Sequence, residues 1–136
     1  QVGGFKRADG TVDEARVAAV NEHAYRELLY RHDVDAVMAI RVRSVSAPFY
    51  KDRAEWDDAK QKVRHKGRSN VQGNIGASSI ELIIFDRQEK LLFLNRGGIE
   101  LLMWRNQQKF VDLPPEELFT EEKRVRKAVD YAMDPF

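Results

Sequence analysis

The sequence predicts an α+β fold, in which a small antiparallel sheet is built on a central hairpin and packed by an N-terminal and a C-terminal helix. Three observations support this prediction: a helical apolar stripe near the start of the chain, an apolar pair of strands within residues 79–104, and a second helical stripe near the end. A chain of 136 residues is long enough for one domain with its own core. We therefore expect residues 1–136 to form a single domain.

The N-terminal helix has the clearest signals. Residues 1–10 carry glycines at positions 3, 4 and 10, which is typical of a flexible arm. Thr11 and Glu14 have the spacing of a capping box, so a helix is predicted from there to about Arg31. Its apolar stripe consists of Val17, Val20, Ala24, Leu28 and Leu29.

Residues 37–46 fit either a helix or a strand, and their alternation favours the strand. Asp33 and Asp35 interrupt the helix, because aspartate prefers caps and turns. Ile40 and Val42 then alternate with two arginines, which is the pattern of a strand with one solvent-facing side. Pro48 is expected to end this strand.

The following segment predicts a second helix and a loop. Asp52 and Glu55 suit a helix start, and Trp56, Ala59 and Val63 fall on one helical face. Gly67 suits the helix end. Residues 67–78 are therefore expected to form a glycine-containing loop.

The central hairpin follows this loop. Ile80, Leu82 and Ile84 recur with a period of two, a polar turn occupies residues 86–89, and residues 90–95 resume as an apolar strand. Residues 99–104 fit either a third strand or a short helix. Two glycines in a first helical turn would each cost about 1 kcal/mol relative to alanine, which favours the strand.

These segments, IIFD, RQEK and LLFLN followed by RGGIELLMW, resemble the opening of a PAS sensor domain. The resemblance covers residues 79–104. It implies that Asp86 serves the turn, that Asn95 caps a following helix, and that a helical middle and three further strands should follow. The residues after 104 are mostly predicted to be helical, so a complete domain of this kind does not fit. It also implies that the chain is a sensor-like binding module.

The C-terminal segment predicts the last helix. Pro114 and Pro115 suit its start, and Glu116 and Glu117 suit the positive end of the helix dipole. Its apolar stripe consists of Leu118, Val125, Ala128, Val129 and Ala132.

Composition limits the classes of function. The net charge of +1 indicates no general preference for acidic partners. The chain has no cysteine, which excludes disulfides and thiolate metal sites. No apolar run approaches the ~20 residues that span a bilayer. We expect a soluble protein, in the cytoplasm or an organelle interior rather than secreted. Gln1 is not an initiator residue, so the chain is open to being part of a longer protein.

A basic cluster is the strongest functional signal. It predicts contacts with the phosphate backbone of RNA or DNA. The alternative is that these cations only stabilise the end of a helix. The candidate residues are Lys60, Lys62, Arg64, Lys66 and Arg68, together with Arg124 and Lys127 from the last helix.

The sequence offers no set of residues for catalysis, a metal or a cofactor. His23 and His32 are nine residues apart, which places them on different faces of one helix, and no nucleophile and base can be paired. The sequence therefore favours a non-enzymatic protein without excluding an enzyme, and it indicates no cofactor and no metal. The large aromatic residues either form the core or line a small-ligand pocket; they are Trp56, Trp104, Phe85, Phe93 and Phe110.

Two functions follow as hypotheses. The first is a non-enzymatic binding module that acts through a partner chain, a second copy of itself or a small ligand. The second is a nucleic-acid-binding subunit of a larger complex that uses residues 60–68.

Overall fold

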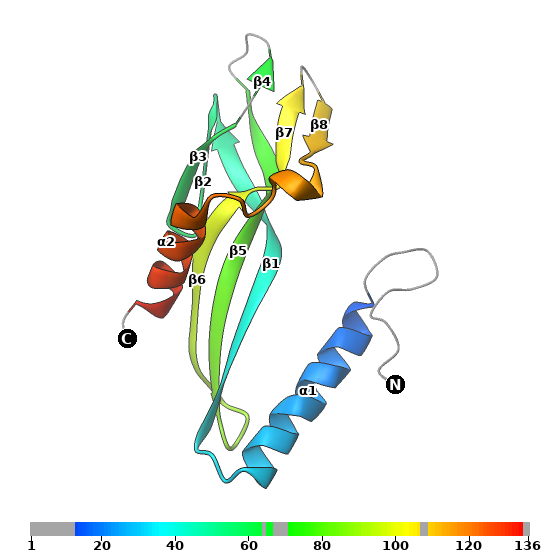
Figure 1. The fold of residues 1–136 in the computed structure, drawn as a ribbon, viewed down its shortest axis with the longest axis vertical. Helices are drawn as coiled ribbons and strands as arrows, with labels where there is room; N and C mark the ends of the chain where they lie inside the picture. Colours follow the sequence, from blue (N-terminus) through cyan, green and yellow to red (C-terminus); the bar gives the residue numbers. More distant parts are fainter. Residues whose placement is uncertain (1–12, 64, 67–70, 107–108, 135–136) are drawn as a thin grey trace. The chain divides into compact units, whose positions relative to one another are not determined.

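The computed structural model describes residues 13–63, 65–66, 71–106 and 109–134 and confirms the α+β class (Figure 1). One sheet has the strand order β3-β2-β1-β5-β6 and the other has the order β4-β7-β8. The strands of the first sheet are β1 (Ala36–Tyr50), β2 (Arg53–Trp56), β3 (Ala59–Lys62), β5 (Gln72–Asp86) and β6 (Leu91–Leu101). Those of the second are β4 (His65–Lys66), β7 (Met103–Asn106) and β8 (Lys109–Asp112). The helices are α1 (Glu14–Arg31), the short 3-10 helix η1 (Pro115–Glu117) and α2 (Glu122–Met133).

The described chain forms two compact units. The first unit contains the residues up to Met38 together with Ile84–Leu92. The second unit contains Ala39–Ile83 together with the residues from Phe93 onward. No helix in the described ranges is both long and apolar enough to cross a membrane.

In the first unit, α1 packs against the turn of the hairpin. The rings of Tyr25 and Phe85 lie 5.8 Å apart between centroids. Arg26 donates to Glu89 at 3.2 Å, and Arg87 donates to the backbone carbonyl of Val34 at 2.7 Å. These contacts link the helix and the segment that follows it to the hairpin, as the predicted packing of an N-terminal helix requires.

α1 is capped by Asp13 rather than by the predicted Thr11, while the hairpin turn is organised by Asp86 as expected. The side chain of Asp13 accepts from the backbone N–H of Arg16 at 3.1 Å and caps α1. Thr11, the cap predicted from sequence, and the arm at residues 1–10 lie outside the described residues. The side chain of Asp86 accepts from the backbone N–H groups of Gln88 and Lys90, both at 2.9 Å, and so organises the turn.

In the second unit, small and aromatic residues from β1, β2, β3, β5 and β6 form the core. Trp56 is 8% exposed. Its indole N–H donates to the backbone carbonyl of Ser78 at 3.1 Å, so this buried donor has a hydrogen-bond partner. The core residues are Ala47, Phe49, Ala54, Trp56, Ala59, Val63, Ile75, Ala77 and Leu101.

The two outermost strands of the five-stranded sheet are joined by one side chain. The carboxamide of Gln61 on β3 donates to the backbone carbonyl of Ile99 at 2.7 Å and accepts from the backbone N–H of Leu101 at 3.1 Å. Nearby, the N–H of Gly98 donates to the carbonyl of Asp57 at 2.7 Å. The β2–β3 hairpin is thereby fixed to the second half of β6.

The helix predicted from Asp52 to Gly67 is wrong, because residues 53–62 form the β2–β3 hairpin. Asp57 and Asp58 have φ angles of 40° and 60° and make its two-residue turn, a conformation that aspartate tolerates. Ala54 and Trp56 are buried while their neighbours in β2 are exposed. This period of two outweighs the helical spacing of Trp56, Ala59 and Val63.

Two further predictions are wrong: the loop at residues 67–78 and the end of a strand at Pro48. Residues 72–78 belong to β5 rather than to a glycine-containing loop, while residues 67–70 lie outside the described residues. β1 continues through Pro48 to Tyr50. Proline has no backbone N–H to donate to a neighbouring strand. The pairing of β1 with β2 begins at Phe49, so Pro48 does not have to donate a hydrogen bond to β2.

After the hairpin the chain is extended rather than helical, but residues 99–101 continue β6 instead of beginning a third strand. β6 runs through Asn95 to Leu101, and β7 follows from Met103. Asn95 therefore caps no helix after it. Its side chain instead donates to the carbonyls of Tyr131 and Asp134 at 2.9 and 3.1 Å, where α2 ends.

The last helix begins later than predicted. The two prolines lead only into η1. Leu118 then has an extended backbone, and Phe119 has a φ of 57°, so the chain leaves the helical path before α2 begins at Glu122. Of the predicted apolar stripe, Ala128 and Ala132 are buried at 2% exposure each, whereas Val129 is 37% exposed.

Candidate functional site: a cavity beside α2

The second unit contains a cavity of about 470 Å³. Side chains from β3, β6, β7, η1, α2 and the segment between β8 and η1 line it. Its location therefore depends on the β2–β3 hairpin and on the late start of α2.

One wall of the cavity is apolar. Leu101, Met103, Trp104 and Leu113 line it, and Leu101 is only 6% exposed. The backbone N–H of Leu113 donates to the carbonyl of Leu102 at 2.8 Å, which holds the segment after β8 against this wall. An apolar wall with an aromatic side chain is typical of pockets that bind small molecules.

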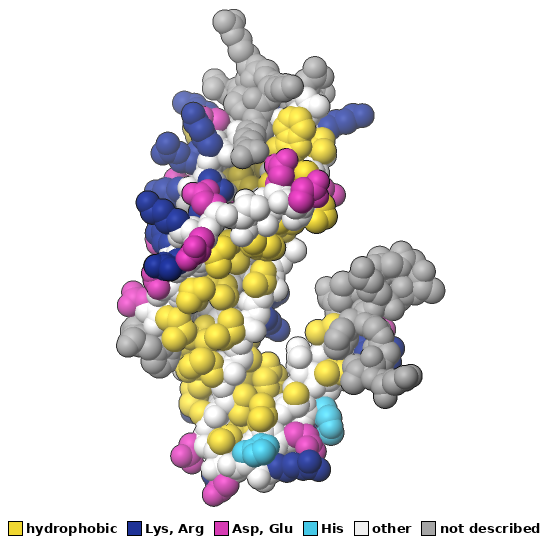
Figure 2. Space-filling view, viewed as in Figure 1, with side chains coloured by type: hydrophobic (Ala, Val, Ile, Leu, Met, Phe, Trp, Pro, Cys, Tyr) yellow, Lys and Arg dark blue, Asp and Glu magenta, His cyan; other side chains and the backbone are white. Residues whose placement is uncertain are grey.

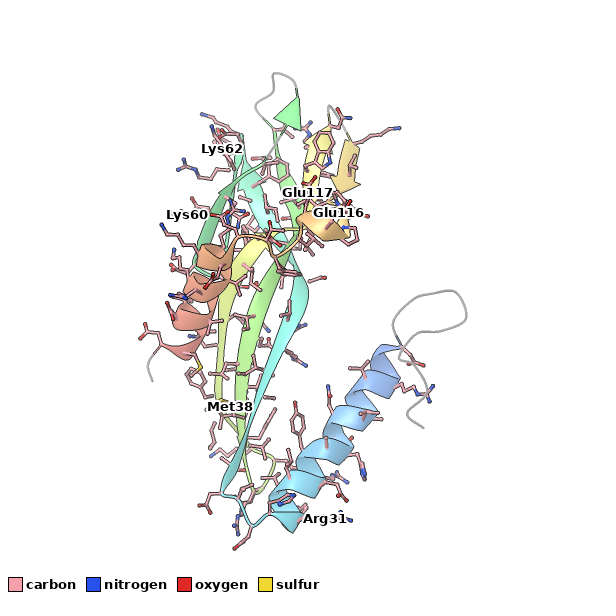
Figure 3. The ribbon with its side chains drawn as sticks, viewed as in Figure 1. Arg31, Met38, Lys60, Lys62, Glu116 and Glu117 are labelled. Carbon is pink, nitrogen blue, oxygen red and sulfur yellow. The ribbon has the colours of Figure 1, made fainter. Side chains whose placement is uncertain are left out.

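Three of the predicted cations lie at the rim of this cavity. Lys60 and Lys62 are two residues apart on β3, so both project from one face of the strand (Figure 3). Arg124 comes from α2 and lines the same cavity. Each has a carboxylate partner: Lys60 pairs with Glu55 at 3.3 Å, Lys62 with Asp52 at 3.9 Å and Arg124 with Glu121 at 2.7 Å. All three cations are at least 43% exposed, so these pairs are weak.

The remaining predicted cations are placed differently. Lys127 lies beside a smaller cavity of about 90 Å³, 3.8 Å from the carboxylate of Asp58. Lys66 belongs to β4, but its side chain is outside the described part of the chain, as are residues 64 and 68. The structure thus brings Lys60, Lys62 and Arg124 together.

Carboxylates complete the rim. Glu117 and Glu121 line the same cavity. Glu100 is 5% exposed and accepts from the backbone N–H of Phe119, which ties the η1–α2 connection to β6. Figure 2 shows basic and acidic side chains interspersed around α2 and the β2–β3 hairpin. The rim therefore offers both donors and acceptors beside an apolar wall.

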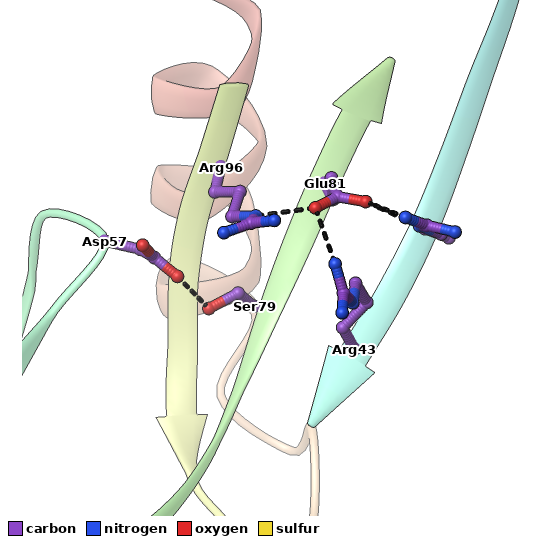
Figure 4. Close-up of polar contacts among 6 residues, drawn as sticks. Arg43, Asp57, Ser79, Glu81 and Arg96 are labelled. Carbon is purple, nitrogen blue, oxygen red and sulfur yellow. Dashed lines mark hydrogen bonds and ion pairs between the residues drawn. The ribbon is translucent and has the colours of Figure 1, made fainter. Parts of the chain in front are cut away.

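Elsewhere in the second unit, Glu81 forms a polar cluster that is not predicted from the sequence (Figure 4). Its side chain is fully buried and pairs with Arg41 at 2.5 Å, Arg43 at 3.0 Å and Arg96 at 2.5 Å. The available signal was the alternation of Arg41 and Arg43 with apolar residues in β1, combined with a carboxylate inside the most apolar strand. Their pairing across strands could not be seen in the sequence.

The arginines decide the ionisation of Glu81. Burial alone raises its pKa, but the hydrogen bonds from Arg96, Arg41 and Arg43 together outweigh burial, so the pKa lies below its ordinary value of 4.5. Within the described residues, no group of three or more potential ligands of the histidine, cysteine or carboxylate type is arranged to hold a metal ion.

This lowered pKa predicts a pH dependence of stability. Because the folded-state pKa of Glu81 is lower than the unfolded one, its contribution is complete above the unfolded pKa and is lost as pH falls through the folded pKa. Urea denaturation between about pH 7 and about pH 3 should show the free energy of unfolding falling in the acid range. A Glu81→Gln variant should lose part of this acid dependence; an unchanged slope would contradict the assignment to Glu81.

Comparison with protein-family models, curated proteins and solved structures finds no match to this chain.

Proposed function

We propose that the chain is a non-enzymatic binding module whose cavity beside α2 takes a small molecule with an apolar body and an acidic group. The observation that supports this most is the convergence of Lys60, Lys62 and Arg124 on a cavity with the apolar wall of Met103 and Trp104. The volume of about 470 Å³ lies within the range of roughly 300–1,000 Å³ typical of ligand pockets.

The rim chemistry specifies the acidic group. The carboxylate partners of Lys60 and Lys62 are exposed and stand 3.3 and 3.9 Å away, so these ammonium groups lose little when they turn to a ligand. The guanidinium of Arg124 can bind a carboxylate or phosphate through two parallel hydrogen bonds. The apolar body of the ligand would lie against Trp104. This contact would remove apolar surface of both the ligand and the indole ring from water, which favours binding.

The test combines native mass spectrometry with variants of α2. The gently purified protein is expected to carry a bound small molecule, or to be stabilised in thermal unfolding by members of a panel of amphipathic carboxylates and organic phosphates. Arg124→Gln should weaken binding about tenfold, the usual effect of losing one charged hydrogen bond. Arg126→Gln is the matched control, because Arg126 is on the same helix, 73% exposed and paired with Glu122 at 2.9 Å, and is not part of the lining.

Two outcomes would contradict this proposal. One is the absence of any bound mass together with no stabilisation by the whole panel. The other is equal binding by the native protein and the Arg124→Gln variant.

A second function is supported by the same convergence of cations. Lys60, Lys62 and Arg124 would then contact a phosphate backbone, as the sequence analysis proposed for residues 60–68. A single-stranded oligonucleotide added to the panel distinguishes the two. Binding that falls steeply with salt and is lost on exchanging Lys62, Arg64 and Lys66 for glutamate assigns the surface to nucleic acid.

A further inference from the structure

The cluster around Glu81 carries more positive charge than the buried carboxylate neutralises. Each guanidinium has five N–H donors, whereas one carboxylate has two oxygen atoms. In the described part of the chain, Arg41, Arg43 and Arg96 have no carboxylate partner other than Glu81. Their side chains remain 46%, 43% and 38% exposed, while that of Glu81 is 0% exposed. The surface therefore presents unused donors and a net positive charge.

The three arginines share one face of the sheet. Arg41 and Arg43 are two residues apart on β1, about 6.5–7 Å along the strand. Arg96 lies on β6, which is separated from β1 by β5, so its strand is about 10 Å away. Leu94 is two residues before Arg96 and is 44% exposed, so it adds an apolar side chain to the same face. We name this surface, formed by Arg41, Arg43, Leu94 and Arg96, the arginine face.

We propose that the arginine face binds an extended acidic segment of a partner protein, with carboxylates at alternate positions. Side chains at alternate positions of an extended peptide project to one side with the same repeat as Arg41 and Arg43. Each guanidinium can then bind one carboxylate through its outward donors. This inference is independent of the cavity beside α2, which is formed by other residues.

Glu81 prepares the arginines for such a partner. An arginine side chain normally loses much rotamer freedom when it binds, but here Glu81 already fixes one side of each guanidinium at 2.5–3.0 Å. Binding therefore costs less entropy than it would on free arginines. The chain as a whole has a net charge of +1, so long-range attraction of a nucleic-acid polymer is small. The exposed Leu94 also fits a protein partner better than a phosphate backbone.

Selection from a displayed library of random linear peptides tests this proposal. The native protein should enrich peptides with aspartate or glutamate at alternate positions. Selection on the Arg43→Gln variant should lose this enrichment, and purified peptides should bind that variant at least about tenfold more weakly, since a charged hydrogen bond is removed. Arg53→Gln, which makes the same charge change at an exposed position of β2, should behave like the native protein.

The Arg43→Lys variant controls for weaker binding that results from misfolding. It keeps the positive charge beside Glu81 but loses the planar fork, so it should fold and still bind the selected peptides more weakly than the native protein does. The proposal is overturned if selected peptides lack the acidic pattern, if no peptide is enriched over the variants, or if Arg43→Gln binds as well as native. It is also overturned if these arginines bind an oligonucleotide and no acidic peptide.

Discussion

Glu81→Gln is expected to lower the free energy of unfolding by about 1.5–3 kcal/mol, the usual value of hydrogen bonds to a charged group, because the arginines left behind are 38–46% exposed. The substitution keeps the shape of the side chain but removes its charge. Arg41, Arg43 and Arg96 then face one another without the anion that brings them together. Their mutual repulsion adds to the loss of three charge-assisted hydrogen bonds.

Urea denaturation at neutral pH measures this loss. Glu121→Gln is the matched control, because it removes an exposed partner of Arg124 and should change the free energy of unfolding by less than about 1 kcal/mol. If both variants had the same stability, the cluster around Glu81 would not contribute to the fold as described.

The second large effect is expected at Gly97. A Cβ atom at this position would overlap the backbone carbonyl oxygen of Ala128 and would lie 2.7 Å from its carbonyl carbon. The obstacle is the backbone of α2, which cannot turn aside as a flexible side chain can. Overpacking typically costs about 1–3 kcal/mol. We expect Gly97→Ala to lower the free energy of unfolding of the second unit by about 3 kcal/mol, the upper end of this range.

The measurement is thermal unfolding combined with amide exchange in α2. Gly97→Ala should lower the melting temperature and increase exchange in α2, because the helix has to move away from β6. Gly73→Ala is the control, since its nearest obstacle is the Phe49 side chain at 3.2 Å, which can shift. Normal protection of α2 in the Gly97 variant would show that the helix does not pack as closely as described.

Local sequence signals predicted the elements whose period was unambiguous. The extent of α1 to Arg31, the presence of a strand around Ile40 and Val42, and the hairpin at residues 80–95 agree with the structure. The predicted faces of that strand do not agree, because Ile40 and Val42 are 60% and 58% exposed. The β2–β3 hairpin was mistaken for a helix because Trp56, Ala59 and Val63 also satisfy helical spacing. The adjacent aspartates at positions 57 and 58 were the signal that could have corrected it, since they suit a two-residue turn.

The sites were harder to predict than the elements. Lys60, Lys62 and Arg124 were identified as cations, but their meeting at one cavity depends on how β3 and α2 pack in space. The role of Trp104 in that cavity is equally non-local. The cluster around Glu81 joins residues 15 to 40 positions apart in the sequence, and only the alignment of three strands brings them together.

Gln61 has a consequence for how the molecule avoids unwanted assembly. A strand at the end of a sheet offers free N–H and C=O groups that can pair with any other chain, and proteins usually shield them with charges, bulges or prolines. Here the carboxamide of Gln61 has the donor and the acceptor of a peptide group. It hydrogen-bonds to the backbone carbonyl of Ile99 and the backbone N–H of Leu101, so these two groups of β6 are not free to pair with another chain. A neutral amide does not titrate, so this shield against aggregation should persist under acidic conditions that weaken the Glu81 cluster.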